Sequence, residues 1–428
     1  MQNSLLDRTQ SSTNPSTDLL GNIKDPAVGY ARGNILSNEV DEVRRQKLAY
    51  KLIHERFKKN GDQAIYNLTG LIRGFPLHDD DRPSLPSYLH HIARYNNQLE
   101  TEALRLLNGT PQEHDCFLAT RVSSGMLAIM LSILEPGDSV ISLVVADTSH
   151  PSVSQAVRIA GGKFHETVGI DDFESSLTST QSPRAVVITT ISPSKKHLPQ
   201  EQTLRAIAAA RKCGALVILD DAHMAARISL YGEQPGLKLG ADAIVWSLDK
   251  HMTGPRSGLV AGKAELIKKI KARALALGVE AQLGQVLAGW RALQAFTPEP
   301  IRAAQAAAEK LLDSFNTLAN GHAYLAGAGV ALPGERLLQI AIERSGKCSK
   351  IVPIEATVFA AMRLLETTGG VTISAVGMPG ASCTFRLMLY PDGIRMGLPT
   401  MLSAVSKIFD ELVEVIDRPE QVRKVLLG

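Results

Sequence analysis

Two stretches of the sequence decide the fold: Val217-Ile-Leu-Asp-Asp-Ala-His223 and Ala243-Ile-Val-Trp-Ser-Leu-Asp-Lys-His-Met-Thr-Gly-Pro-Arg256. In each of them a short apolar run ends in polar residues. Apolar runs without alternation are typical of strands that are buried on both faces of a parallel sheet. Further runs of this kind begin at Cys116, Ser139, Ala185 and Gly258, and helical stretches lie between them. This order of strands and helices predicts a layered α/β domain with a mostly parallel sheet.

The regions on either side of this pattern predict the rest of the architecture. Residues 1 to about 40 are rich in Ser, Asn, Thr and Asp, which is typical of a loosely held arm. A helical pattern follows over 39–59, and an Ala-, Leu- and Lys-rich stretch from 264 to 319 predicts helices that leave the sheet. We expect an N-terminal arm and helix over residues 1–60, a large domain over 61–299, and a smaller C-terminal α+β domain over 300–428.

Composition and charge exclude several classes of protein. The formal net charge is +3, and Lys and Arg do not cluster with aromatic residues, so we expect no nucleic-acid partner. The four cysteines form no CxxC pair, so we expect no metal site of the zinc-knuckle type and no dense disulfide framework. No apolar run approaches the roughly 18 residues of a membrane span. The polar start of the chain shows no secretory signal, so we expect a cytoplasmic protein without a membrane partner.

The two deciding stretches also predict a site. Asp220 ends one strand, and Lys250 follows the end of another. Open α/β sheets bind ligands at the carboxyl ends of their strands, so a carboxylate and an amine there can face the two ends of one flat ligand. Pyridoxal 5'-phosphate (PLP) requires this pair. A lysine amine carries it as a Schiff base, and an aspartate keeps its pyridine nitrogen protonated. We therefore predict that Lys250 is the anchor and general base, and that Asp220 is the pyridinium partner.

Other polar residues near these strand ends are candidates for holding the same cofactor. His223 would bind near the ring hydroxyl, and Ser247 would bind the phosphate. Ser124, Gly125 and Met126 begin a helix whose N-terminal N–H groups and dipole suit a phosphate, although a Ser-Ser-Gly segment is by itself only a good helix start. His150 follows another strand, where it is either a ring-stacking residue or a polar loop histidine.

These residues resemble the fold-type I PLP-dependent enzymes over about residues 110 to 400. Asp-x-Ala-His at 220–223 and Lys-x-x-x-Gly-Pro-Arg at 250–256 are similar to serine hydroxymethyltransferase, as is Ile394-Arg-Met-Gly-Leu-Pro-Thr400. The Lys250 segment and residues 258–277 also resemble the selenocysteine-synthase-like branch. The resemblance implies a three-layer αβα domain with a seven-stranded sheet and a homodimer or higher homo-oligomer with the site at the interface. It also implies that His150 stacks on the ring and that Arg395 binds the substrate carboxylate.

Several residues compete for roles in this site. Arg386 is an alternative to Arg395 for the carboxylate, since a guanidinium suits a planar two-point contact, although Arg386 could instead be a solvated residue on an edge strand. Arg256 would touch the cofactor phosphate or fix the turn after Gly254-Pro255. We expect Lys195 and Lys196 to be exposed rather than catalytic.

The function predicted from these residues is PLP chemistry on an amino acid. We expect a lyase or transferase that acts at Cα or Cβ by aldol-type or elimination chemistry, because of the similarity to hydroxymethyltransferase and selenocysteine-synthase-like segments. An aminotransferase is the first alternative, and a non-catalytic binding protein of the same fold is the second. The Tyr- and Glu-bearing N-terminal segment of the hydroxymethyltransferases is absent, which argues against folate-dependent one-carbon transfer.

Overall fold

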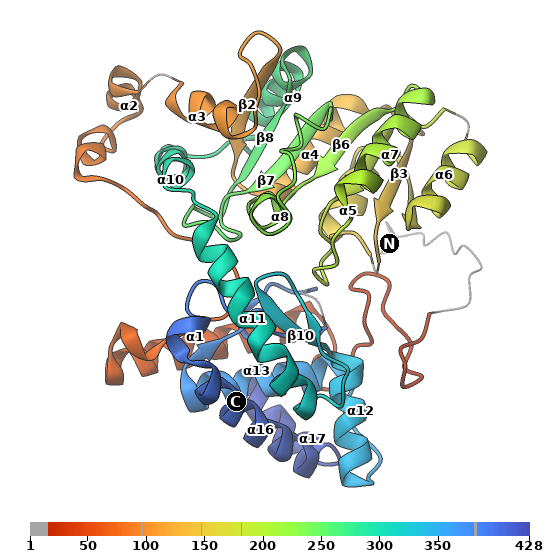
Figure 1. Cartoon of the computed structure of the whole chain (residues 1–428), viewed down its shortest axis with the longest axis vertical. Helices are drawn as coiled ribbons and strands as arrows, with labels where there is room; N and C mark the ends of the chain where they lie inside the picture. The colour runs from red at the N-terminus through yellow and green to blue at the C-terminus, as the bar shows by residue number, and fades with distance from the viewer. Residues whose placement is uncertain (1–15, 96, 147, 181, 381–382) are drawn as a thin grey trace, which may run out of the picture.

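A seven-stranded sheet forms the centre of the upper part of the molecule in Figure 1. The computed structural model describes residues 16–95, 97–146, 148–180, 182–380 and 383–428. The strands lie in the order β2-β8-β7-β6-β5-β3-β4, and only the two pairings of β8 are antiparallel. Their bounds are β2 His114–Ala119, β3 Ser139–Val144, β4 Lys163–Val168, β5 Ala185–Thr189, β6 Leu216–Asp220, β7 Ala243–Ser247 and β8 Gly258–Lys263.

Helices cover both faces of this sheet. Buried side chains of α4 (Val122–Ile133), α5 (Pro151–Ile159) and α9 (Ala264–Leu277) pack on one face. The other face is covered by α3 (Gln98–Leu106), α6 (Ile170–Ser179), α7 (Gln200–Lys212), α8 (Met224–Tyr231) and α10 (Leu283–Gln294). Successive residues of one strand serve opposite faces: Val187 lies in the first apolar layer, and Val186 and Ile188 lie in the second. The predicted three-layer α/β fold with a mostly parallel seven-stranded sheet is confirmed.

One strand of the sheet has no counterpart among the apolar runs of the sequence. β4 lies at the edge, and three of its six residues, Lys163, His165 and Val168, are exposed. A half-exposed edge strand needs no continuous apolar run, because only one row of its side chains packs against a helix.

The lower part of the molecule is an α+β unit built from the C-terminal residues. Its three-stranded antiparallel sheet has the order β12-β10-β9. The elements are α11 Glu299–Leu318, β9 Tyr324–Leu325, β10 Gly329–Pro333, α12 Gly334–Ser345, α13 Pro353–Thr368, β11 Gly370–Val371, α14 Ile373–Val376, β12 Thr384–Met388, α15 Gly393–Met396, α16 Leu398–Val415 and α17 Pro419–Leu427. α13 is almost wholly buried and forms the centre of this unit.

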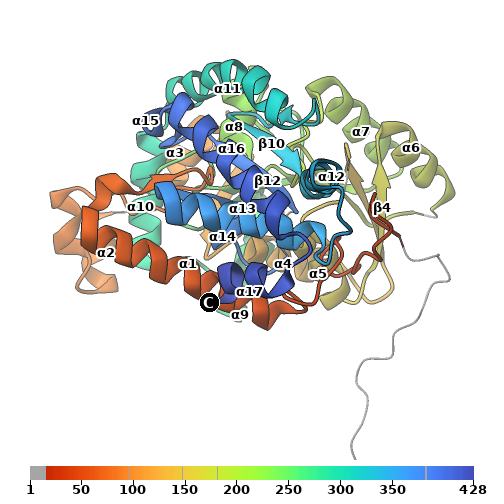
Figure 2. The same cartoon turned by 90° about the horizontal axis from the view of Figure 1, so that it is seen from below.

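The N-terminal segment packs into the same lower unit. Helix α1 (Glu39–Asn60) lies alongside α13, α14 and α17 (Figure 2), and β1 (Tyr66–Asn67) pairs in parallel with β11. The buried carboxylate of Glu355 on α13 accepts the N–H groups of Ile35 at 2.7 Å and Leu36 at 3.1 Å. Short 3₁₀ helices at Asp62–Ala64 and Asp79–Ser84 and helix α2 (Tyr88–Arg94) then lead to the large sheet. Both ends of the described chain therefore contribute to one unit.

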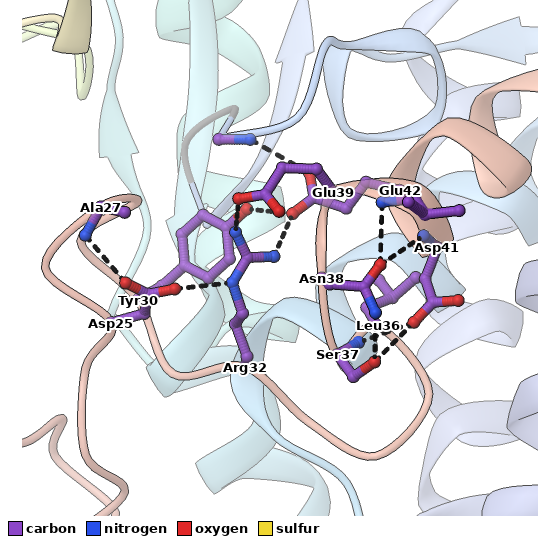
Figure 3. A network of polar contacts seen from close by, with 12 residues as sticks. Asp25, Ala27, Tyr30, Arg32, Leu36, Ser37, Asn38, Glu39, Asp41 and Glu42 are labelled. Atoms are coloured by element: carbon purple, nitrogen blue, oxygen red, sulfur yellow. Dashed lines mark hydrogen bonds and ion pairs between the residues drawn. The ribbon is translucent and has the colours of Figure 1, made fainter. Parts of the chain in front are cut away.

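A polar network joins the segment before α1 to the first turn of that helix (Figure 3). The buried Glu42 carboxylate accepts the Tyr30 hydroxyl at 2.8 Å and Nη1 of Arg32 at 3.0 Å. Arg32 also pairs with Asp25 at 2.7 Å. The second oxygen of Glu42 accepts the N–H of Gly380 at 3.1 Å, which ties the loop after α14 to α1.

Candidate active site

The carboxyl ends of the parallel strands bring most of the predicted residues to one edge of the large sheet. Asp220 is the last residue of β6, and β7 ends three residues before Lys250. β6 and β7 are neighbours in the sheet, so the two residues leave it side by side. Burial raises the pKa of Asp220, and the positive charge of Lys250 opposes this shift. Burial lowers the pKa of Lys250, and Asp220 and Asp249 oppose that shift. The amine and the carboxylate therefore share one poorly hydrated space.

Asp220 and Asp221, the residue that follows β6, have different surroundings. Asp221 is fully buried and binds Arg227 of α8 through both oxygens, at 2.9 Å to Nε and 2.6 Å to Nη2. It also accepts the Thr190 hydroxyl at 2.8 Å. Asp220 accepts only the N–H of Ala222, at 3.4 Å, among the hydrogen bonds between described residues. Asp221 thus holds the strand end in place, and Asp220 keeps its carboxylate available to a ligand.

A backbone crossing from the N-terminal segment lies against Lys250. Leu71 and Lys250 form an isolated antiparallel bridge, and the N–H of His251 donates to the carbonyl of Gly70 at 3.2 Å. Ser247 donates its hydroxyl to Asp249 at 2.6 Å, and Asp249 pairs with Nε of Arg73 at 3.5 Å. Ser247, predicted to bind a phosphate, is therefore engaged with a carboxylate in this structure.

The start of α4 faces the same edge of the sheet. Its N-cap is Arg121, without a side-chain cap, so the N–H groups of Val122, Ser123 and Ser124 have no acceptor within the helix. The N–H of Gly125 already donates to the Arg121 carbonyl at 3.0 Å. The side chain of Met126 is fully buried in the layer between α4 and the sheet. Of the three predicted phosphate ligands, Ser124 is the one with an open backbone donor, and its hydroxyl accepts from Thr120 at 3.0 Å.

Arginines surround this helix start. Arg121 and Arg256 each direct an Nη2 at the sulfur of Met378, at 3.6 Å and 3.8 Å. Burial, followed by the charges of Arg73 and Arg121, lowers the pKa of Arg256. Guanidinium groups beside helix N–H groups that have no acceptor within the helix are suited to bind an anion.

The two histidines predicted to hold the cofactor, His150 and His223, also lie at this edge of the large sheet. His150 caps α5, and its Nδ1 accepts the N–H of Ser152 at 3.2 Å. Burial and the charges of Lys250, Lys195 and Arg121 lower its pKa to about 4. His223 is buried, and its Nε2 lies 2.7 Å from Nζ of Lys195. Lys195 was expected to be exposed, and that expectation is wrong, because its amine turns inward to His223; Lys196 is exposed.

The structure separates the two candidate carboxylate ligands. Arg386 on β12 is buried, donates Nη1 to the Pro193 carbonyl at 2.8 Å, and lies close enough to Lys250 and His223 for its charge to lower their pKa values. Arg395 on α15 is exposed. Its guanidinium lies over the Tyr66 ring at 4.3 Å and donates to the carbonyls of Gln63 and Ile65. The structure therefore brings Arg386 to the site and leaves Arg395 at the junction of α15 with the N-terminal segment.

Four residues at the site were absent from the predicted set or given no role in it: Arg73, Arg121, Lys195 and His251. Arg121 begins the Ser-Ser-Gly segment and His251 directly follows Lys250, so proximity in sequence could have drawn attention to both. Arg73 gives no such signal, because it comes from a segment more than one hundred residues before Lys250. Within the described ranges, no helix has the length and hydropathy of a membrane span, and no cluster of His, Cys, Asp or Glu could hold a metal ion.

Comparison with known proteins places the chain in a family. Residues 326–392 match the model of the UPF0425 C-terminal domain. A UPF0425 pyridoxal phosphate-dependent protein of Methanothermobacter thermautotrophicus is 34% identical over 401 residues, which cover 92% of this chain and 100% of that protein. A serine hydroxymethyltransferase of Coprothermobacter proteolyticus is 30% identical over 153 residues, 33% of this chain and 35% of that protein.

A solved structure agrees on the fold. A chain of the crystal structure of the SepCysS–SepCysE N-terminal domain complex has a TM-score of 0.60 at 13% identity, and the match covers 84% of this chain and 98% of that chain. The predicted resemblance to fold-type I PLP-dependent enzymes is confirmed. Taken with the full-length similarity to the Methanothermobacter protein, these matches show that the chain belongs to the UPF0425 pyridoxal phosphate-dependent proteins.

Proposed function

We propose that this chain is a PLP-dependent enzyme that acts on an amino acid, with the cofactor attached to the amine of Lys250. One observation carries the proposal: a lysine amine and an aspartate carboxylate are buried together at adjacent strand ends, beside an anion site. The family name supports the choice of PLP as the ligand.

The residues present fit PLP at each of its polar groups. The Lys250 amine suits the aldehyde, and the Asp220 carboxylate suits the pyridine nitrogen. The helix start with Ser124, Arg121 and Arg256 suits the phosphate. Nδ1 of buried His223 has no hydrogen-bond partner among the described residues, which leaves it available to a ring substituent. His150 at the head of α5 remains our candidate for stacking on the ring.

Bound PLP would withdraw electrons from the Cα of an attached amino acid and so stabilise a carbanion there. The chain's own residues would control that chemistry. Asp220 would hold a proton at the pyridine nitrogen, because its buried carboxylate accepts only the N–H of Ala222 among the hydrogen bonds between described residues. The lowered pKa of Lys250 favours a neutral amine that can take up and return a proton. Arg386 would hold the α-carboxylate of the substrate and so set which bond at Cα is activated.

We propose lyase or transferase chemistry at Cα or Cβ as the reaction class, in a cytoplasmic homodimer, with a free amino acid as substrate. The similarity to a serine hydroxymethyltransferase over a third of the chain supports this choice over transamination. Stoichiometric transfer of the amino group to a keto acid, in the absence of any cleavage or replacement product, would assign the chain to the aminotransferases instead.

The attachment site can be tested directly. The purified protein incubated with PLP is treated with borohydride, digested and analysed by mass spectrometry for a phosphopyridoxyl-lysine. We expect the modification on Lys250, and we expect Lys250→Ala to lose both the modification and the visible absorption band. Lys195→Ala is the matched control, because it removes the other amine of the same site. A modified Lys195 and an unmodified Lys250 in the wild-type protein would refute the assignment.

A further inference from the structure

His251 occupies an unusual position beside the attachment lysine. It is 3% exposed and has a backbone φ of 59°, a region that side chains other than glycine seldom adopt. Its ring stacks on Tyr390 with centroids 6.1 Å apart and planes 17° apart, and it meets the His223 ring edge-on at 5.9 Å. The imidazole is thus held firmly from its backbone and from one face.

Neither ring nitrogen of His251 has a hydrogen-bond partner among the described residues, and the same is true of Nδ1 of His223. Most buried polar atoms in proteins are hydrogen-bonded, and an unsatisfied buried nitrogen lowers stability. Burial, with the charges of Lys195 and Lys250, lowers the pKa of His251 to about 3. Burial and Lys195 also lower the pKa of His223. Both rings are therefore neutral near pH 7, and each neutral imidazole has one donor and one acceptor nitrogen.

The two histidines line a small, partly open space, which we call the histidine cavity. It has a volume of about 10 Å³ and is lined by Lys195, His223, Tyr231 and His251, and by apolar residues of α8 and of the turn between β9 and β10. A cavity needs about 10–15 Å³ to hold one water molecule. The space suits a group the size of water and is too small for a carboxylate or a phosphate.

We propose that the histidine cavity is a subsite for one hydroxyl or thiol group of the substrate, so that the enzyme selects amino acids with a short hydroxylated or thiol side chain. A hydroxyl can donate to the acceptor nitrogen of the neutral His251 ring or accept from its donor nitrogen. A methyl group of the same size would leave both ring nitrogens of His251 without a partner. This inference rests on the proposed function, because it assumes that the amino acid is held beside Lys250.

The test measures amino-acid binding to the PLP-loaded protein from its visible absorption, immediately after mixing. L-Serine is compared with L-alanine, and L-threonine with L-2-aminobutyrate, since each pair differs by one hydroxyl. We expect the hydroxylated member of each pair to bind about tenfold more tightly, the effect of one to two additional hydrogen bonds. His251→Phe keeps a ring against Tyr390 and should abolish this preference by weakening the binding of the hydroxylated member of each pair.

Two further variants separate this role from a structural one. His251→Asn retains a donor and an acceptor and tolerates a positive φ, so it should restore part of the preference. His54→Phe, at an exposed position of α1, should leave the preference intact. In the cofactor-free protein, His251→Phe should unfold at the same temperature as the wild type or at a higher one, because it removes nitrogens that have no partner. A large fall in that temperature would assign His251 to the core and overturn the proposal.

The remaining outcomes also decide the matter. Equal binding of L-serine and L-alanine to the wild type, or an equal loss of both in His251→Phe, would overturn the subsite and leave the proposed function standing. A changed absorption band in His251→Phe before any amino acid is added would show that the histidines serve the cofactor ring instead. If the wild-type protein forms no band with PLP, the proposed function fails and the subsite fails with it.

Discussion

Replacing Arg227 with methionine should destabilise the large domain strongly. The Arg227 and Asp221 side chains are 1% and 0% exposed, and two hydrogen bonds of 2.9 and 2.6 Å join them. Against the effect of burial, the carboxylates of Asp221 and Glu233 raise the pKa of Arg227, so the guanidinium stays charged. Without it, Asp221 would keep only the Thr190 hydroxyl as a side-chain donor. Breaking a buried pair by removing one partner costs about 3–5 kcal/mol, and we expect a loss in this range for Arg227→Met.

A double-mutant cycle isolates the pair. Asp221→Asn alone should also be costly, since Arg227 then keeps one carboxylate, Glu233 at 3.0 Å. In the double variant no unpaired carboxylate remains at position 221, so its loss should fall short of the sum of the single losses by about 2–3 kcal/mol.

The assay is equilibrium unfolding in urea, followed by far-UV circular dichroism, on the cofactor-free protein. Arg205→Met is the matched control: Arg205 also pairs with two carboxylates, Asp171 and Glu174, but its side chain is half exposed. We expect its midpoint to stay close to that of the wild type. Losses that simply add in the double variant, or an Arg227→Met midpoint no lower than that of Arg205→Met, would refute the view that Asp221 is held by a buried ion pair.

Three other perturbations have defined outcomes. The pKa of His251 in the folded protein, about 3, lies below its usual value of 6.5, so the folded protein loses stability as pH falls from about 6.5 toward 3. His251→Phe should therefore reduce the slope of the unfolding free energy against pH in that window by up to about 1.4 kcal/mol per pH unit. An unchanged slope would mean that the ring titrates normally. Arg386→Gln should weaken amino-acid binding to the PLP-loaded protein about tenfold or more. Arg395→Gln should leave that binding unchanged and lower the free energy of unfolding by about 1–2 kcal/mol. The reverse pattern in absorption titrations would restore Arg395 as the carboxylate ligand. Gly125→Ala would place a Cβ 2.7 Å from Cγ2 of Val260 and should cost about 1–3 kcal/mol in urea unfolding, while a neutral effect would show that α4 can move away from the sheet.

Much of the fold followed from the sequence because the central strands are buried on both faces. Such strands need continuous apolar runs, and the six runs that we identified are strands β2, β3, β5, β6, β7 and β8. β4 was missed because it lies at the edge, where one row of side chains faces solvent. The packing of α1 against the C-terminal helices could not be predicted either, because an amphipathic pattern indicates that one face of a helix is buried but not which element covers it.

The site was predictable where it depends on strand ends, and less so where it depends on distant contacts. Asp220 ends β6 and Lys250 follows the end of the neighbouring β7, so topology alone brings them together. The choice between Arg386 and Arg395 could not be made, because both lie in the same short C-terminal stretch. What separates them is a contact with Pro193 in one case and with Gln63 in the other. Those contacts depend on tertiary packing that no local pattern records.

The pairing of β1 with β11 has a consequence for biosynthesis. Tyr66 leaves the ribosome long before its partner Gly370, and Ile35 and Leu36 leave long before Glu355. About 300 residues must be translated in between, which takes roughly 15–60 s at about 5–20 residues per second. During that interval the large sheet can close while the amphipathic α1 waits without its apolar partners. The nascent chain should therefore expose a chaperone-binding segment at α1, and a circular permutant that begins after β1 and joins the original termini would shorten that wait.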